Sequence, residues 1–150
     1  MTSNIKSIAF FGASTGVGLA ALKRTLAAGH ICIALCRDPS KLTAIFPSES
    51  TPNLKVIKGN AHDISTVSQC LLTDNGCIVD VIVSTIGAKP RGMTVDDPDV
   101  CKKGAATLLD ALAQLRSTGI TGNPHIVACG TVGFSRFGRD TPIAMVPIYY

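Results

Sequence analysis

The stretch that decides the fold is Gly12-Ala13-Ser14-Thr15-Gly16-Val17-Gly18, in which three glycines follow a Gly-x-x-x-Gly-x-Gly spacing. It stands between an apolar run, residues 5–11, and a segment with the spacing of an amphipathic helix. The residues expected to face inward from this helix are Val17, Leu19, Leu22 and Leu26. A short apolar strand that turns sharply into a helix predicts the opening unit of an α/β sheet.

Helix signals recur between further apolar runs. Asp38 followed by Pro39 predicts a short helix that begins at Pro39 and runs to about residue 46. Asp63 stands where it can cap a helix that breaks at residues 75–76. The residues that this helix is expected to bury are Ile64, Val67 and Leu71. A last helix, from about residue 98 to Gly119, is expected to bury Leu108, Leu109, Leu112 and Leu115.

The apolar runs between these helices predict four more strands. They cover residues 31–36, 54–58, 79–84 and 125–129. Strict alternation of strands and helices requires right-handed crossovers and parallel strands. We therefore expect an α/β fold: a doubly wound, Rossmann-like parallel sheet of about five strands in the order 3-2-1-4-5, with helices on both faces. Residues 1–150 are expected to form one domain.

Composition excludes several classes of protein. Of the 150 residues, 46% are hydrophobic and 16% charged, and the net charge of +4 is scattered, which argues against a nucleic-acid partner. No apolar stretch is long enough to cross a membrane. The six cysteines form no Cys-x-x-Cys pair and the three histidines share no metal-ligand spacing, so we expect reduced thiols and no metal site. A cytoplasmic location follows from these expectations.

The glycine turn has the chemistry of a phosphate site. Gly12 lets the chain turn off the strand, Gly16 lets a phosphate approach the backbone, and Gly18 lets the helix pack on the sheet. Free amides at the helix start, that of Val17 among them, face an anion there. Ser14 and Thr15 add hydroxyl donors. We interpret the turn as a dinucleotide-binding site, with a purely structural turn as the alternative.

The end of the second predicted strand indicates which dinucleotide is bound. Arg37 stands about 20 residues after the glycine turn, where a cation accommodates the 2′-phosphate of NADP(H). Asp38 is already accounted for as a helix cap. NADP(H) is therefore favoured over NAD(H). In the alternative, Arg37 is solvated and Asp38 binds the ribose, which would favour NAD(H).

These residues resemble the atypical short-chain dehydrogenase/reductase superfamily, in particular NmrA-like proteins and biliverdin-IXβ (flavin) reductases. The resemblance spans nearly the whole chain. The segments that carry it are Phe10-Phe11-Gly12-Ala13-Ser14, the stretch from Gly29-His30 to Arg37-Asp38-Pro39, Gly59-Asn60-Ala61 with Asp63, Ser84-Thr85-Ile86-Gly87-Ala88 and Val127-Ala128-Cys129-Gly130-Thr131.

The resemblance implies roles for two more loops. Asn60, where the family usually has Asp, and Ala61 would flank the adenine, whereas Ser84, Thr85 and Gly87 would line the inner ribose and nicotinamide. Both loops follow strands, where such sheets bind ligands. A turn residue is the alternative for Asn60, and a bare turn for Gly87.

The chain departs from the resemblance at the catalytic residues. The Tyr-x-x-x-Lys pair of many short-chain dehydrogenases is absent, because Tyr149 and Tyr150 are the two tyrosines and no lysine follows them. Thr131 is a weak candidate for a hydroxyl donor, with a strand-end turn residue as its alternative. We expect an NADP(H)-dependent oxidoreductase that transfers hydride to a small organic acceptor. The alternatives are a non-catalytic NmrA-like dinucleotide sensor and a truncated, inactive fragment.

The end of the chain suggests an incomplete copy of the family domain. The resemblance implies further strands and a helix that build the substrate pocket, whereas residues 143–150 form an apolar tail broken by proline. The fifth predicted strand would then present an open edge. We expect self-association through this edge and the tail.

Overall fold

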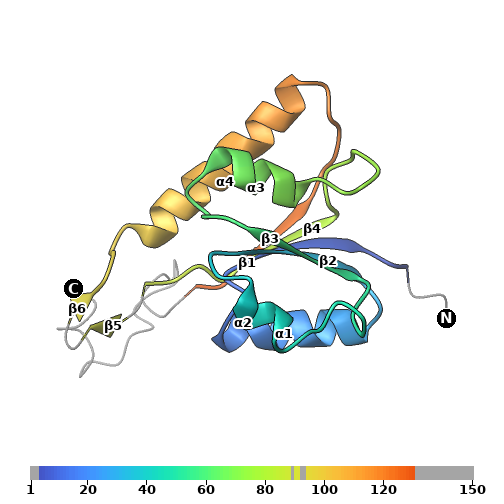
Figure 1. Cartoon of the computed structure of the whole chain (residues 1–150). Helices are drawn as coiled ribbons and strands as arrows, with labels where there is room; N and C mark the ends of the chain where they lie inside the picture. Colours follow the sequence, from blue (N-terminus) through green and yellow to red (C-terminus); the bar gives the residue numbers. More distant parts are fainter. Residues whose placement is uncertain (1–3, 89, 92–93, 131–150) are drawn as a thin grey trace, which may run out of the picture.

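The computed structural model describes residues 4–88, 90–91 and 94–130. Its five-stranded sheet is entirely parallel and has the order β3-β2-β1-β4-β7, as predicted (Figure 1). The strands are β1 (Ser7–Phe11), β2 (Ile31–Cys36), β3 (Leu54–Lys58), β4 (Val81–Ser84) and β7 (His125–Ala128). Three of them are slightly shorter than predicted, because β1 and β4 each begin two residues later and β7 ends one residue earlier.

Helices cover both faces of the sheet. In Figure 1, α1 and α2 lie below it and α3 and α4 above it. Their bounds are α1 (Gly16–Ala27), α2 (Ser40–Thr43), α3 (Ile64–Leu71) and α4 (Val100–Ser117). The doubly wound Rossmann-like class is thereby confirmed. No helix among the described residues is long and apolar enough to cross a bilayer.

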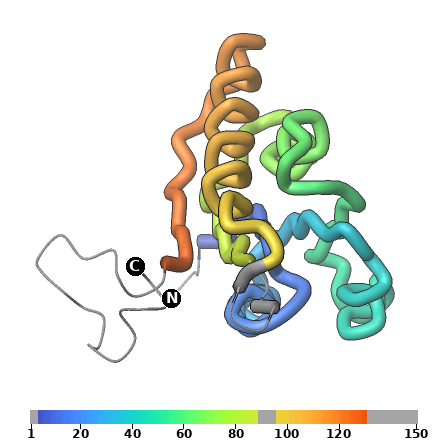
Figure 2. The backbone as a smooth tube through the Cα atoms, turned by 90° about the vertical axis from the view of Figure 1, so that its left-hand side faces the viewer, coloured from blue at the N-terminus to red at the C-terminus, as the bar shows by residue number. Residues whose placement is uncertain are grey.

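A small antiparallel pair, β5 (Pro90–Arg91) and β6 (Thr94–Val95), follows β4. The sequence predicted a loop in this region, since two-residue strands are too short to produce a periodic pattern. The pair lies beyond the carboxyl ends of the main strands, on the side from which Figure 2 is viewed. It leads the chain from the sheet back to the start of α4.

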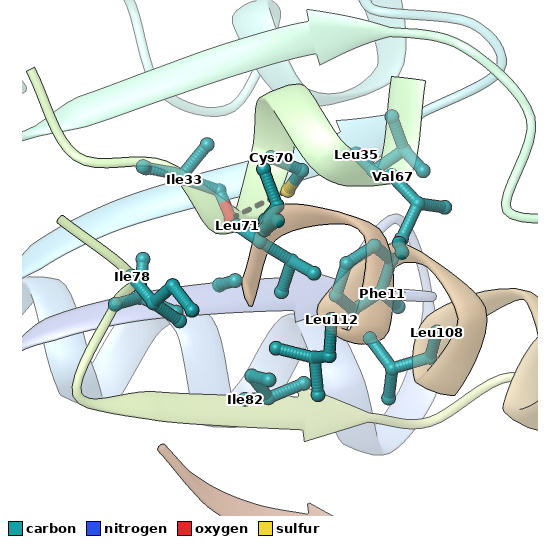
Figure 3. Packing of buried hydrophobic residues seen from close by; sticks show 14 residues of the cluster. Phe11, Ile33, Leu35, Val67, Cys70, Leu71, Ile78, Ile82, Leu108 and Leu112 are labelled. Atoms are coloured by element: carbon teal, nitrogen blue, oxygen red, sulfur yellow. Dashed lines mark hydrogen bonds between the residues drawn. The ribbon is translucent and has the colours of Figure 1, made fainter. Parts of the chain in front are cut away.

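The core has two layers because β1 and β2 bury both of their faces. Above the sheet, Val67 and Leu71 of α3 and Leu108 and Leu112 of α4 gather over Phe11 of β1 (Figure 3). Below the sheet, a second cluster joins the opposite face to α1 and α2. Its fully buried large residues are Phe10, Leu22, Cys32 and Leu42.

Three predicted core positions are wrong. Val17 is 66% exposed, Leu109 57% and Ile64 38%. Leu109 fails because the buried stripe of α4 runs through Leu108, Leu112 and Leu115 at intervals of four and three residues, which turns Leu109 outward. Val17 and Ile64 stand in the first turns of their helices, whose buried positions begin at Gly18 and Val67.

The predicted start of α3 at Asp63 is confirmed, whereas α2 begins one residue later than predicted, at Ser40 with Pro39 as its N-cap residue. The Asp63 carboxylate accepts the backbone N–H groups of Ser65 at 3.2 Å and Thr66 at 3.4 Å. The Asp38 carboxylate accepts the N–H of Ser40 at 3.3 Å and its hydroxyl at 2.6 Å. The helix that follows Asp38 is nevertheless shorter than predicted, ending at Thr43 instead of near residue 46.

Candidate functional site

The glycine turn is held in place by Thr85, the residue that follows β4. Gly12 has φ of +88°, and a Cβ there would lie 2.7 Å from the carbonyl oxygen of Thr85, so glycine is required. The backbone N–H of Thr85 donates to Phe11 O at 2.8 Å, and its hydroxyl donates to Gly12 O at 3.0 Å. The turn therefore has a fixed backbone, with one side against β4 and the other open.

The start of α1 is left uncapped. Thr15 occupies the N-cap position, but its side chain makes no capping hydrogen bond, and the first turn carries no acidic residue. The first amides of a helix have no partner within it. Together with the positive end of the helix dipole, they provide donors for an anion.

A groove of about 690 Å³ lies over this turn. Nine of the predicted cofactor-binding residues line it: Gly12, Ser14, Thr15, Gly16, Val17, Gly18, Arg37, Thr85 and Gly87. Asp38 and Lys41 extend the groove at the α2 side, and Cys129 bounds it after β7. The groove thus runs across the carboxyl edge of the sheet, which Figure 2 faces.

A second cavity, of about 310 Å³, adjoins the groove. It contains the predicted residues Asn60 and Ala61, and it shares Gly12, Ser14 and Arg37 with the groove. The loops after β1, β2, β3 and β4 all contribute to it. Ser84, by contrast, lines neither cavity, because it is still within β4 and pairs with Ala128. Thr131, Tyr149 and Tyr150 lie outside the described residues.

Arg37 and Asp38 differ in how they are engaged. Hydrogen bonds from Ser40, chiefly from its hydroxyl, hold the pKa of the Asp38 carboxyl below its usual value, so Asp38 is an ionised cap. Arg37 is exposed, lines both cavities and has no side-chain partner among the described residues. The cation is therefore available for a ligand, whereas one oxygen of the carboxylate, Oδ1, is bonded to α2.

The loop after β3 is held in place by its own hydrogen bonds. Asn60 Oδ1 accepts the N–H of His62 at 3.2 Å, and Asn60 O accepts the Thr66 hydroxyl at 3.0 Å. A Cβ at Gly59 would lie 2.7 Å from Thr66 Cβ, so the loop packs tightly on α3. His62 Nε2 lies 3.3 Å from Val100 O, which links this loop to the start of α4.

Sequence reasoning missed several residues of the cavities. Lys41 stands one helical turn after Asp38, a spacing that could have placed it beside Arg37. His62, Asp96 and Asp97 line the smaller cavity. Residue spacing could not have predicted the two aspartates, because they follow β6 and their position depends on the pairing of β5 with β6.

The cysteines of the core are unsuited to chemistry. Burial raises the pKa of the Cys32 and Cys70 thiols to about 12, so neither forms a thiolate near neutral pH. All six cysteines are unpaired in the structure; Cys32, Cys36 and Cys70 are buried, and Cys77, Cys101 and Cys129 are exposed. No group of three or more potential ligands for a metal ion occurs in the parts of the chain that the structure describes.

A glycine turn, an uncapped helix and a cation at the end of the next strand define a dinucleotide-binding α/β domain. The chain belongs to the NAD(P)H-binding family, whose model matches residues 12–145. It is 39% identical over its whole length to reductase pytE of Aspergillus terreus, and covers 62% of that protein. Oxidase pynE of Aspergillus niger is 32% identical over 75% of this chain, which covers 48% of that protein.

Solved structures share the fold at low sequence identity. The bulky-bulky ketone specific alcohol dehydrogenase from Comamonas testosteroni has a TM-score of 0.62 at 19% identity, over 90% of this chain and 59% of that one. The anaerobillin reductase ChuY from Escherichia coli O157:H7 has a TM-score of 0.57 at 21% identity, over 85% of this chain and 52% of that one. A mutant NmrA has a TM-score of 0.51 at 18% identity, over 73% of this chain and 31% of that one. The predicted resemblance to short-chain dehydrogenase/reductase folds is thus confirmed.

Proposed function

We propose that this chain is an NADP(H)-dependent oxidoreductase that transfers hydride between the nicotinamide and a small organic molecule, and that residues 1–150 form one NAD(P)-binding domain. The observation that carries the preference for NADP(H) is the contrast between Arg37 and Asp38. A cation with no partner among the described residues stands at the end of β2, while the carboxylate beside it is bound to Ser40.

The charges around the groove support this preference. A 2′-phosphate beside Arg37 would also lie near Lys41, which lines the same groove from α2. Arginine offers a planar fork of donors to a phosphate, and lysine adds a point charge. NAD(H) instead needs an acceptor for its 2′-hydroxyl. Asp38 Oδ1 already accepts both bonds from Ser40, which leaves Oδ2 of that carboxylate for a ribose.

The bound cofactor would supply the hydride, and the protein would hold and orient it. The glycine turn and the start of α1 would hold the pyrophosphate, Arg37 and Lys41 the 2′-phosphate, and Gly87 the nicotinamide half. Proximity would then contribute much of the rate enhancement, as in reductases that rely on solvent protons. The names of the two curated relatives differ, one a reductase and the other an oxidase, so the direction of transfer is left open.

The proposal is tested with Arg37→Ala and the matched control Arg24→Ala. Arg24 is an exposed arginine in the last turn of α1 and lines neither cavity. Calorimetry should show that Arg37→Ala weakens the binding of NADPH by about 1.5–3 kcal/mol and the binding of NADH far less. Arg24→Ala should change neither binding free energy. Equal losses for NADPH and NADH would show that Arg37 does not bind the phosphate.

Catalysis is tested separately from binding. NADPH oxidation, followed in the presence of flavin, quinone and carbonyl acceptors, should reveal turnover with at least one of them. Binding of NADPH without turnover of any acceptor would contradict the oxidoreductase proposal. It would favour a non-catalytic dinucleotide sensor instead.

We also propose a cytoplasmic location and self-association. Six unpaired cysteines suit a reducing compartment. All four residues of β7 are exposed, and within the described part of the chain this strand pairs with β4 alone. An apolar strand with an open edge is prone to pair with a second copy. Light scattering should therefore give a mass above that of one chain.

A further inference from the structure

The smaller cavity lies between two parts of the chain that are far apart in the sequence. One side is formed by residues 59–62 of the loop after β3, and another by Asp96, Asp97 and Val100, at and just before the start of α4. In Figure 1 the start of α4 projects past the carboxyl ends of the main strands, toward β5 and β6. The way in which these two sides are joined therefore determines the shape of the cavity.

Packing anchors the first turn of α4 only weakly. Residues 101–103 are exposed, and the buried positions of the helix begin at Gly104. The side chains that pack on the sheet and on α3 come later in the helix, at Leu108 and Leu112 among others. The position of the first turn therefore depends on its hydrogen bonds.

The loop after β3, by contrast, is fixed by its own contacts. Asn60 O accepts the N–H of Asp63 and the hydroxyl of Thr66, both at 3.0 Å. The backbone N–H of His62 donates to Asn60 Oδ1 at 3.2 Å, which fixes the backbone from which the imidazole projects. A loop that is held in this way can support a helix start that is not.

The His62 ring joins this loop to α4. His62 Nε2 lies 3.3 Å from Val100 O, and a carbonyl oxygen only accepts, so Nε2 carries the hydrogen and donates it. The protonated ring also carries a hydrogen on Nε2, so this bond survives protonation. The Cys101 thiol, a weaker donor, ties the same turn to the loop after β4 through Ile86 O at 3.3 Å.

We infer that His62 is a positioning residue, which holds the start of α4 over the smaller cavity before any ligand arrives. Its effect on cofactor binding rests on the proposed function. A cavity that is already formed in the free protein avoids the cost of ordering its walls when the ligand binds. His62 thus acts on affinity through Val100 and α4.

Hydrogen exchange of the free protein tests the structural half of this inference. His62→Leu should speed the exchange of backbone amides in residues 97–104 by about threefold to tenfold, as expected for the loss of one hydrogen bond. His62→Gln should exchange like the wild-type protein, because its side-chain NH₂ stands at nearly the distance of Nε2. His62→Asn should exchange like His62→Leu, because its NH₂ stands nearer to the backbone, at the distance of Nδ1.

Calorimetry with NADPH tests the functional half on the same proteins. His62→Leu and His62→Asn should bind NADPH about threefold to tenfold more weakly, and His62→Gln should restore the wild-type affinity. The matched control is His125→Leu, which should change neither exchange in residues 97–104 nor affinity. His125 is an exposed histidine at the first position of β7 and lines neither cavity.

The outcomes separate this inference from the function on which it rests. Weaker NADPH binding by His62→Leu with unchanged exchange would overturn the inference, because the ring would then contact the cofactor directly. Exchange in His62→Gln as fast as in His62→Leu would also overturn it, since the hydrogen bond would not be what holds α4. Faster exchange in His62→Leu, together with no binding of NADPH by the wild-type protein, would refute the cofactor proposal and leave the link between His62 and α4 standing.

Discussion

Gly18→Ala should damage both the fold and the cofactor turn, because Gly18 stands where α1 meets the sheet. A Cβ at this position would lie 2.5 Å from the carbonyl oxygen of Gly12 and 3.0 Å from Ala13 Cα, and would overlap the Thr85 hydroxyl oxygen. Ordinary contacts of a Cβ are 3.4–4 Å. The first two neighbours are backbone atoms, so the helix itself must move away.

The magnitude follows from these contacts. Overpacking a fixed site costs about 1–3 kcal/mol. Displacing the Thr85 hydroxyl from Gly12 O adds roughly 1 kcal/mol. The helix propensity of alanine offsets less than about 1 kcal/mol. We expect a net loss of about 2–3 kcal/mol, which lowers Tm by roughly 4–12 °C for a domain of this size.

Thermal unfolding and NADPH titration measure the two effects. Gly87→Ala is the control for stability, because a Cβ there meets nothing within 4 Å, and its Tm should not change. In a Thr85→Ala background the loss from Gly18→Ala should shrink but persist, since the contact with Gly12 O remains. A Gly18→Ala protein with unchanged Tm and NADPH affinity would refute the close packing of the turn.

Three further changes test the account elsewhere in the molecule. Asp80 accepts the backbone N–H and the hydroxyl of Ser7, both at 2.8 Å. These hydrogen bonds, the backbone one first, lower the pKa of Asp80. The contribution of Asp80 to stability is therefore complete above the unfolded-state pKa and is lost as pH falls through the lower folded-state pKa. Urea titrations at neutral and acid pH should show that Asp80→Asn reduces this pH dependence, and an unchanged dependence would contradict it. Asp63→Ala should cost about 1 kcal/mol in the same assay through loss of the α3 cap, and a loss near zero would show that the cap is dispensable. Val127→Lys places a charge on exposed β7 and should reduce the mass found by light scattering, whereas Leu109→Lys on the outer face of α4 should not; equal masses for both variants would argue against pairing through β7.

The sequence predicted the architecture because hydrophobic spacing and helix caps are local signals. The cap at Asp63 and the positions of β2 and β3 were predicted correctly from a few neighbouring residues each. The spacing failed at Leu109, which is exposed, while Ala111 is fully buried on the face of α4 that packs against the sheet and α3. A small residue that packs closely has no distinctive pattern in a sequence.

Within the candidate site, sequence patterns could predict only the residues that directly follow a strand. The glycine turn and Arg37 each lie directly after a strand, so their meeting in one groove followed from the fold. Asp96 and Asp97 come some dozen residues after β4, and their place depends on the β5–β6 pair and on the contact between His62 and Val100. Such long-range contacts leave no periodicity.

The central claim is that this chain binds NADP(H) through the cation at the end of β2. The most direct measurement is the calorimetric affinity of the wild-type protein for NADPH and for NADH in the same buffer and at the same ionic strength. We predict that NADPH binds at least about tenfold more tightly, as one charge-assisted contact to the 2′-phosphate requires. Equal affinities, or tighter binding of NADH, would contradict the account.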